Sequence, residues 1–102
     1  MANVFITEYA RLGADLSGKI VLAGFEPAAA EQVIANPVAS TQSSVLNAST
    51  TFVMIHVDAA AHVKFGTNPT AVTTAGHMSA GETRFYGVQP NQAIKIAAIN
   101  GA

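Results

Sequence analysis

Apolar and polar residues alternate along this chain in short stretches, and the densest of these is residues 50–66. Residues 51–57 are rich in β-branched and aromatic side chains, which pack well on a pleated surface and favour a strand. Asp58 and three alanines interrupt the pattern, and residues 62–65 then resume the alternation before an Asn68-Pro69 turn signal. This pattern predicts a central β-hairpin.

The first strand of this hairpin is apolar on both of its faces. The two faces carry Val53, Ile55 and Val57, and Phe52, Met54 and His56, respectively. An antiparallel strand with one face in water alternates apolar with polar residues instead. We therefore expect a second sheet over one face and another element or another chain over the other.

Similar alternation on both sides of the hairpin predicts further short strands. The expected strands are 3–9, 19–23, 83–88 and 93–99, with an edge strand or long loop at 40–47 and short pieces at 71–75 and 77–80. Residues 10–18 are expected to form a loop, and residues 100–102 a free tail. About seven or eight short strands, with turn signals between them, predict an all-β antiparallel β-sandwich.

Residues 25–35 fit two interpretations. Their alanines favour a helix, in which Pro27 would occupy the first turn. Glu26-Pro27 followed by a short run and Asn36-Pro37 also fits an extended segment that ends in a strand at 32–35. The β-rich surroundings favour the extended interpretation, and both remain open at this point.

Composition adds that the chain has more apolar surface to hide than its size suggests. The 102 residues suffice for one domain, of which 50% are hydrophobic and only 11% charged, against about 25% charged in typical soluble domains. No apolar run approaches the roughly 20 residues of a membrane-spanning helix, and the first residues do not resemble a signal peptide. Neighbouring subunits are the simplest cover for the excess apolar surface.

Charge and cysteine content exclude several classes of function. The net charge is −1 and the five basic residues are scattered, so the chain lacks the clustered lysines and arginines that nucleic-acid binding needs. The chain contains no cysteine, which excludes disulfides, thiolate metal sites and a cysteine nucleophile. We expect no nucleic-acid partner and no membrane partner.

The sequence offers only weak candidates for metal-binding or catalytic residues. His56 and His62 flank the predicted hairpin turn with Asp58 between them, and such a set suits zinc if the turn is tight. The spacing matches no known metal pattern, so ordinary strand histidines are the preferred interpretation. No serine lies in a nucleophile turn, and Glu26 and Glu31 are expected to be solvated rather than paired as acid and base. We therefore predict no catalytic residue, metal ligand or cofactor, and a protein that is not an enzyme.

The candidate binding surface follows from the apolar side chains that a thin sandwich cannot hide. These are Phe5, Phe25, Phe52 and Met54, and the strand-like start of the chain adds Val4, Ile6 and Tyr9. An exposed cluster of a few such side chains offers several kcal/mol to a partner, at about 25 cal/mol per Å². Residues 1–24 are expected to provide an arm or strand to neighbouring subunits, and residues 2–9 to add to a neighbour's sheet.

Most of the chain also carries a pattern of strands and turns that is found in a group of other proteins. The matching features are residues 47–53, 57–59, 65–71, 80–83, 85–88 and 94–97, with 6–9 and 26–28. In these features the chain resembles small proteins encoded in the structural-gene regions of tailed bacteriophages and prophages. The resemblance implies a capsid decoration (cement) protein, β-rich and jelly-roll-like, that binds outside the major capsid shell and stabilises it. It brings no catalytic residues.

The resemblance also implies partners and a location. The expected partners are the major capsid protein and other copies of the chain in a symmetric oligomer, a trimer being one form, on the capsid surface of a virion assembled in the host bacterial cytoplasm. A tail, neck or head-fibre component is the alternative within the same class. A carbohydrate-binding module facing the host is the alternative from another class, and it ranks lower because the chain has no tryptophan and only two tyrosines.

Overall fold

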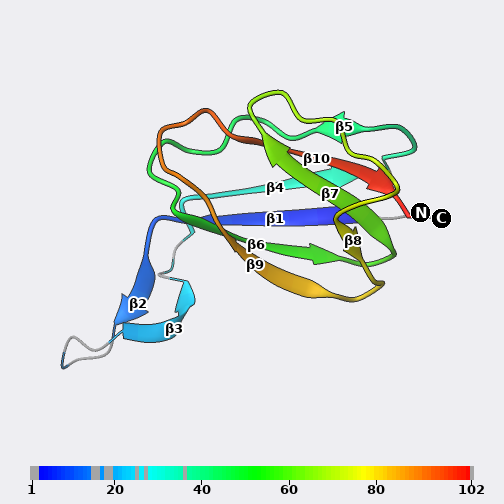
Figure 1. The fold of residues 1–102 in the computed structure, drawn as a ribbon. Coiled ribbons are helices and arrows are strands. Elements are labelled where there is room, and N and C mark those ends of the chain that lie inside the picture. Colours follow the sequence, from blue (N-terminus) through cyan, green and yellow to red (C-terminus); the bar gives the residue numbers. More distant parts are fainter. Residues whose placement is uncertain are drawn as a thin grey trace.

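The computed structural model describes residues 3–14, 17, 20–24, 26, 28–35 and 37–101. Within these residues, eight strands form two four-stranded antiparallel sheets that pack face to face, and two further strands form a small hairpin (Figure 1). The strands are β1 (Asn3–Tyr9), β2 (Leu12–Ala14), β3 (Ile20–Gly24), β4 (Ala30–Ala35), β5 (Thr41–Gln42), β6 (Phe52–Val57), β7 (Ala61–Gly66), β8 (His77–Met78), β9 (Thr83–Gly87) and β10 (Lys95–Asn100). The predicted all-β antiparallel sandwich is confirmed.

The chain passes repeatedly from one sheet to the other. The first sheet has the order β4-β1-β6-β9 and the second sheet the order β5-β10-β7-β8. From β4 onwards, every connection between consecutive strands crosses between the sheets, except the one from β7 to β8. Such crossing connections are typical of Greek-key sandwiches.

The predicted central hairpin is wrong, because β6 and β7 lie in different sheets. Both edges of β6 are already paired, with β1 and with β9. The connection between β6 and β7 is fixed to the two ends of the chain: Asp58 Oδ1 accepts a hydrogen bond from the Asn3 N–H at 2.6 Å, and the Ala60 carbonyl accepts one from the Gly101 N–H at 2.7 Å. The small residues 58–60 therefore serve as a crossing and not as a hairpin turn.

The start of the chain is an interior strand. β1 pairs with β4 on one side and with β6 on the other, so Phe5 lies opposite both Val33 and His56. The expectation that residues 2–9 add to a neighbour's sheet is therefore wrong for the described residues 3–9, because both edges of β1 are occupied. Of the expected arm at 1–24, only β2 and β3 stand outside the sandwich, where they pair with each other (Figure 1).

Several element boundaries differ from expectation. β2 lies within the expected loop at 10–18, and the ambiguous stretch contains the strand β4, which agrees with the extended interpretation. In the stretch 40–47 only β5 is a strand. The expected free tail is wrong for its described part, since Asn100 belongs to β10 and Gly101 is hydrogen-bonded to Ala60.

The core lies between the two sheets and follows the alternation of the strands. Its main side chains are Val4, Ile6, Ile34, Val53, Ile55 and Val57 from the first sheet and Val63, Met78, Ile96 and Ala98 from the second. Removing such branched side chains from water is the main favourable contribution to folding of a domain of this size.

One carboxylate, Glu8, is buried on the inner face of β1. Its Oε1 accepts hydrogen bonds from the Asn47 N–H at 2.6 Å and the Thr50 hydroxyl at 2.9 Å, and its Oε2 accepts one from Gln32 Nε2 at 3.2 Å. These donors satisfy the carboxylate oxygens, as burial requires. Glu8 thus fixes the turn before β6 against the first sheet.

Residues 67–76, here called the cover loop, cross the outer face of the second sheet. Gln42 Nε2 donates hydrogen bonds to Asn68 Oδ1 at 2.8 Å and to the Pro69 carbonyl at 2.9 Å, next to β5. At the other side of the sheet the Val63 N–H donates to the Gly76 carbonyl at 3.0 Å. Beneath the loop, Ala97 points away from the core and is nevertheless 0% exposed. The chain therefore covers this face itself.

Candidate interaction surface

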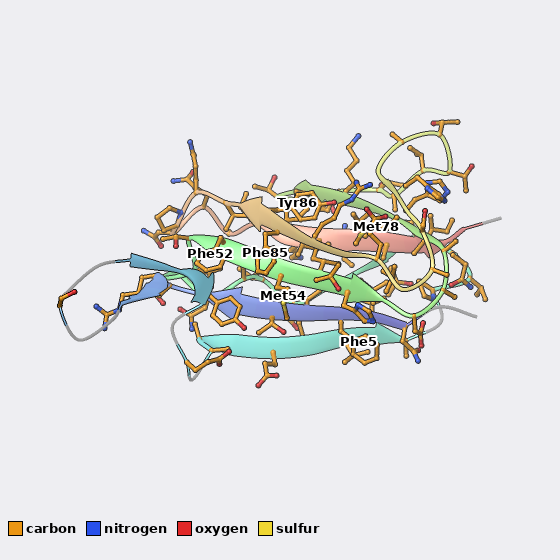
Figure 2. All side chains as sticks on the ribbon, turned by 90° about the horizontal axis from the view of Figure 1, so that it is seen from below. Phe5, Phe52, Met54, Met78, Phe85 and Tyr86 are labelled. Atoms are coloured by element: carbon orange, nitrogen blue, oxygen red, sulfur yellow. The ribbon has the colours of Figure 1, made fainter. Side chains whose placement is uncertain are left out.

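The outer face of the first sheet collects large apolar side chains from all four strands (Figure 2). Alternation along each strand turns outward Phe5, Thr7 and Tyr9 of β1, Val33 and Ala35 of β4, Phe52, Met54 and His56 of β6, and Thr83 and Phe85 of β9. The register places Met54 beside Phe85 on one side and Thr7 on the other. Side chains distant in the sequence thus meet on one surface.

Much of this surface is open to solvent. Phe5 is 39% exposed, Val33 54% and Phe85 59%, while Phe52 and Met54 are half-buried. We call these five residues the outer-face patch. Single exposed apolar side chains are ordinary on protein surfaces, whereas adjacent large ones mark sites of interaction. The patch is therefore the strongest candidate for a binding surface among the described residues.

Aromatic contacts hold part of the patch in place. The rings of Tyr9 and Phe52 stack with centroids 5.1 Å apart, and those of Phe52 and Phe85 lie 6.4 Å apart. At the other end of the face, the Phe5 ring is 6.1 Å from the ring of His56. Side chains fixed in this way lose little rotamer freedom when a partner covers them, so less binding energy is spent on ordering.

Tyr9 ties one end of the face to the segment that follows β3. Its hydroxyl donates a hydrogen bond to Glu26 Oε2 at 2.9 Å, and its side chain is buried. Burial, together with the hydrogen bond to Glu26 and the negative charge of that carboxylate, raises the pKa of Tyr9 above its ordinary value. The phenol therefore stays neutral and hydrogen-bonded well into the alkaline range.

The outer face also carries a few polar groups, one of which, Thr7, lies beside Met54 within the patch. His56 Nδ1 and Thr83 Oγ1 are 2.7 Å apart and hydrogen-bonded. Among the outward positions of the four strands, the one acidic or basic side chain other than His56 is Glu31, on the edge strand β4. The surface is thus nearly uncharged, with Thr7 and His56 as polar side chains on its two central strands.

The structure separates the interface residues expected from the sequence. Phe5, Phe52 and Met54 lie together on the outer face, and Tyr9 lies at its end beneath the stacked Phe52 ring. Val4 and Ile6 lie in the core at 0% and 1% exposure, so they cannot contact a partner. Phe25 lies outside the described residues.

Two members of the patch were not expected, namely Val33 and Phe85. Val33 belongs to the stretch whose helical and extended interpretations were both open, and only the strand places it beside Phe5. The alternation of residues 83–88 did set Phe85 apart from Arg84 and Tyr86, but it did not indicate which strand would lie next to it. Strand order and register decide this, and neither can be read from alternation.

The structure does not bring the candidate metal ligands together. His56 lies on the first sheet, whereas His62 lies on the second, where its Nδ1 is 3.2 Å from the Ala75 carbonyl. Asp58 is hydrogen-bonded to Asn3, and the His62 ring instead packs edge-on against that of His77. In the part of the chain that the structure describes, no three histidine, aspartate or glutamate side chains cluster as metal ligands.

An apolar pocket of about 400 Å³ opens where the two sheets separate. It is lined by Phe65, Tyr86, Gly87, Val88, Gln89 and Ile94. The Phe65 and Tyr86 rings, 4.9 Å apart, also pack against the core. The pocket is thus an extension of the core, and its lining offers little polar surface for chemistry.

Comparisons with known proteins add no relative. No protein-family model matches the chain, and neither a curated protein nor a solved structure is similar to it by these comparisons. No apolar helix of membrane-spanning length occurs among the described residues.

Proposed function

We propose that this chain is a structural protein of a tailed-bacteriophage virion, a decoration (cement) protein that binds the outside of the major capsid shell and stabilises it. The observation that carries the proposal is the outer-face patch, which the chain leaves bare although it covers the opposite face of the sandwich. An apolar surface of this kind suits a subunit of a permanent assembly better than an enzyme or a carrier.

Two further features support the proposal. The chain resembles small phage structural proteins over most of its length, in the strands and turns described above. Eight strands in two sheets of four are also the framework of a jelly roll, which is the fold class we propose for the sandwich. The partners in this proposal are the major capsid protein and further copies of the chain, on the capsid surface.

The proposal is tested by removing the chain from particles. Virions from a phage with a stop codon in this gene are heated or treated with chaotrope beside wild-type virions, and DNA release is measured. We expect release at a lower temperature without the chain, and recovery when purified protein is added back. Equal robustness of the two particles, or absence of the chain from purified virions, would contradict the proposal.

Copy number separates shell decoration from the tail, neck or head-fibre alternative. A decoration protein occupies every equivalent position on the shell, so its copies match the capsomers in number, whereas a neck or tail component forms a single ring or fibre. Quantitative mass spectrometry of purified virions, with the major capsid protein as internal standard, gives this number. A ratio that corresponds to one ring would replace the decoration proposal with the alternative.

A further inference from the structure

The sandwich is open along one side, beside the edge strand β9. Among the described strands, β9 has β6 as its one neighbour in the first sheet. The short strand β8, which residues 79–82 join to the start of β9, pairs with β7 at Ala61 and His62 only (Figure 1). Farther along β7, at Phe65, no described strand continues the second sheet on this side. The later part of β9 therefore faces an opening between the sheets.

The apolar pocket of about 400 Å³ lies in this opening. Its lining includes the Phe65 ring from β7 and the Tyr86 ring from β9, which contact each other and the core. Tyr86 points inward because it lies opposite the buried Val53 of β6. Gly87, the last residue of β9, and Val88 after it also line the pocket. The pocket thus runs directly beside the end of an edge strand.

The free edge of β9 presents backbone groups next to this pocket. The Val88 N–H donates a hydrogen bond to the Thr51 carbonyl, before β6, at 2.9 Å. Bonds in an antiparallel pair recur at every second residue, so the N–H and C=O groups of Thr83, Phe85 and Gly87 point away from β6. These three residues are exposed, and no described strand lies on their side. Such an edge is a template for another strand.

The other edge of the first sheet, at β4, borders polar groups instead. Gln32 Oε1 accepts a hydrogen bond from the Ser44 N–H at 3.0 Å, and Gln32 Nε2 donates one to Glu8 Oε2 at 3.2 Å. These bonds hold the segment before β6 against β4 and bridge the two sheets there. Of these two edges, the one at β9 combines exposed backbone groups with an apolar pocket.

We propose that β9 receives an extended apolar segment of a different protein chain, which pairs with its free edge as an added antiparallel strand and places an apolar side chain in the pocket. Main-chain hydrogen bonds supply affinity in strand addition, and side chains at alternate positions supply specificity. A side chain opposite Tyr86 enters the pocket, and one opposite Phe85 lies on the outer face. A small apolar ligand would fill the pocket and leave the edge unpaired, so the two features together select a polypeptide.

A second copy of β9 does not suit this site. A two-fold antiparallel pairing that uses all five residues of both strands is centred on Phe85 and puts Arg84 of one copy opposite Tyr86 of the other. Arg84 lies on the inner face, opposite the buried Ile55, so a copy would bring a guanidinium group to the apolar pocket. Inward-pointing charges are one means by which edge strands avoid pairing with each other. The edge therefore favours a segment with an apolar residue at that position.

A synthetic peptide tests the proposal on the wild-type protein. The probe is acetyl-Thr-Leu-Thr-Leu-Thr-amide, whose leucines share one face when it is extended. Nuclear magnetic resonance measures binding and amide hydrogen exchange. We expect binding at about 1 mM peptide. We also expect slower exchange at Thr83, Phe85 and Gly87, because these N–H groups gain partners, and no change at Arg84 and Tyr86, which already face β6.

Matched peptides separate the edge from the pocket. With leucine opposite Tyr86, the threonine N–H groups face β9 and the leucine N–H groups face away. One N-methyl group on the central threonine should therefore weaken binding at least about tenfold, and one on the second leucine should change it little. Asparagine in place of both leucines should also weaken binding at least about tenfold, because its amide loses water in the pocket.

A charge in the pocket tests the same site from the side of the protein. We expect Val88→Asp to weaken binding of the probe at least about tenfold, because Val88 lines the pocket. Gln92→Asp, at an exposed position in the turn before β10, is the matched control and should bind like wild type. Far-ultraviolet circular dichroism verifies that both variants are folded. If Val88→Asp does not fold, the matched peptides decide the question on the wild-type protein.

Four results would overturn the inference. These are no binding at this concentration, slower exchange confined to residues outside β9, equal binding of the two methylated peptides, and slow exchange at Thr83, Phe85 and Gly87 in concentrated protein without peptide. The third would assign the pocket to a single side chain or small ligand, and the fourth would assign the edge to a second copy.

The inference goes beyond the proposed function and fails separately from it. A chain that binds the peptide but is absent from virions loses the proposed function and keeps the strand-addition site. A chain that stabilises shells but does not respond to the peptide keeps the function and loses the site.

Discussion

On the outer face of the second sheet Ala97 is completely buried, whereas on the outer face of the first sheet Phe85 remains 59% exposed. The difference comes from the cover loop, which the side chain of Gln42 holds across the second sheet. The loop thus hides small and polar side chains such as Ala97 and His62, while the largest apolar side chains stay bare.

This contrast indicates that the first sheet's outer face is not bare for lack of a connection long enough to cover it. A ten-residue connection long enough to cross a sheet exists between β7 and β8, and it covers the face with less apolar surface to hide. The uncovered face is the one whose aromatic side chains are already held by contacts with each other. A surface that is apolar, ordered and uncovered is suited to a partner.

The largest expected effect is the difference in stability between a charge placed on the covered outer face and a charge placed on the bare one. Ala97→Glu puts a carboxylate under the cover loop, and we expect it to lower the free energy of unfolding by about 3 to 5 kcal/mol, because the charge loses its water and the loop must move. Ala35→Glu, on the outer face of the first sheet, is expected to change it by less than about 0.5 kcal/mol. Urea denaturation at low protein concentration measures both. Equal losses in the two variants would contradict the contrast between the faces.

A smaller effect is expected from adding a side chain at Gly76, at the end of the cover loop. Gly76 has a φ of +69°, and a Cβ there would lie 2.0 Å from the Val63 carbonyl oxygen. We expect Gly76→Ala to cost about 3 kcal/mol, through left-handed strain and displacement of the loop from β7. Gly81→Ala is the matched control, because Gly81 has a φ of +79° and no atom beyond its two chain neighbours lies within 4 Å of its Cβ position. This control should lose only about 1 kcal/mol in the same urea titration.

Removing the anchor at the other end of the loop should cost less. Gln42→Ala deletes the two hydrogen bonds to Asn68 and Pro69, and we expect a loss of about 1 kcal/mol together with faster amide hydrogen exchange in the cover loop. Gln92→Ala, at an exposed position in the turn before β10, should change neither quantity. A loop that exchanges at the wild-type rate without Gln42 would show that this anchor does not hold the cover.

The smallest effect concerns the end of the bare face, where Tyr9 is bonded to Glu26. Since the pKa of Tyr9 is raised in the folded state, the phenol ionises more readily in the unfolded chain. This contribution to stability is fully present below pH 10, the ordinary pKa of tyrosine, and is lost as the pH rises through the folded value. Unfolding free energies between pH 8 and about pH 11 should therefore fall more for wild type than for Tyr9→Phe. If the unfolding free energies of the two proteins fell in parallel with pH, ionisation of Tyr9 would not be the cause of the loss of stability.

Alternation along the strands predicted a good part of this fold. It placed Val53, Ile55 and Val57 on one face of β6, which the second sheet covers as expected, and Phe52 and Met54 on the other, whose expected cover stays a prediction. Such local patterns suffice because a strand's period of two fixes which side chains share a face. The sandwich and most strand positions follow from it.

The partners of each strand could not be predicted in this way. The hairpin prediction failed because β6 is paired on both edges by strands distant in the sequence, which no local pattern records. Val33 and Phe85 were missed as patch residues for the same reason, since cross-strand register brings them together. The burial of Ala97 likewise depends on the hydrogen bonds of Gln42 across the sheet, and nothing near Ala97 in the sequence signals it.

Cysteine labelling of the outer face measures most directly whether a partner covers it. Val33→Cys and Val38→Cys replace the same residue type at two exposed positions, one on the outer face and one off it, in a chain without native cysteine. We expect the maleimide labelling rate of Val33→Cys to fall as protein concentration rises, and that of Val38→Cys to stay constant. Equal, concentration-independent rates at both positions, up to the concentration reached in the assembled particle, would show that the face remains uncovered.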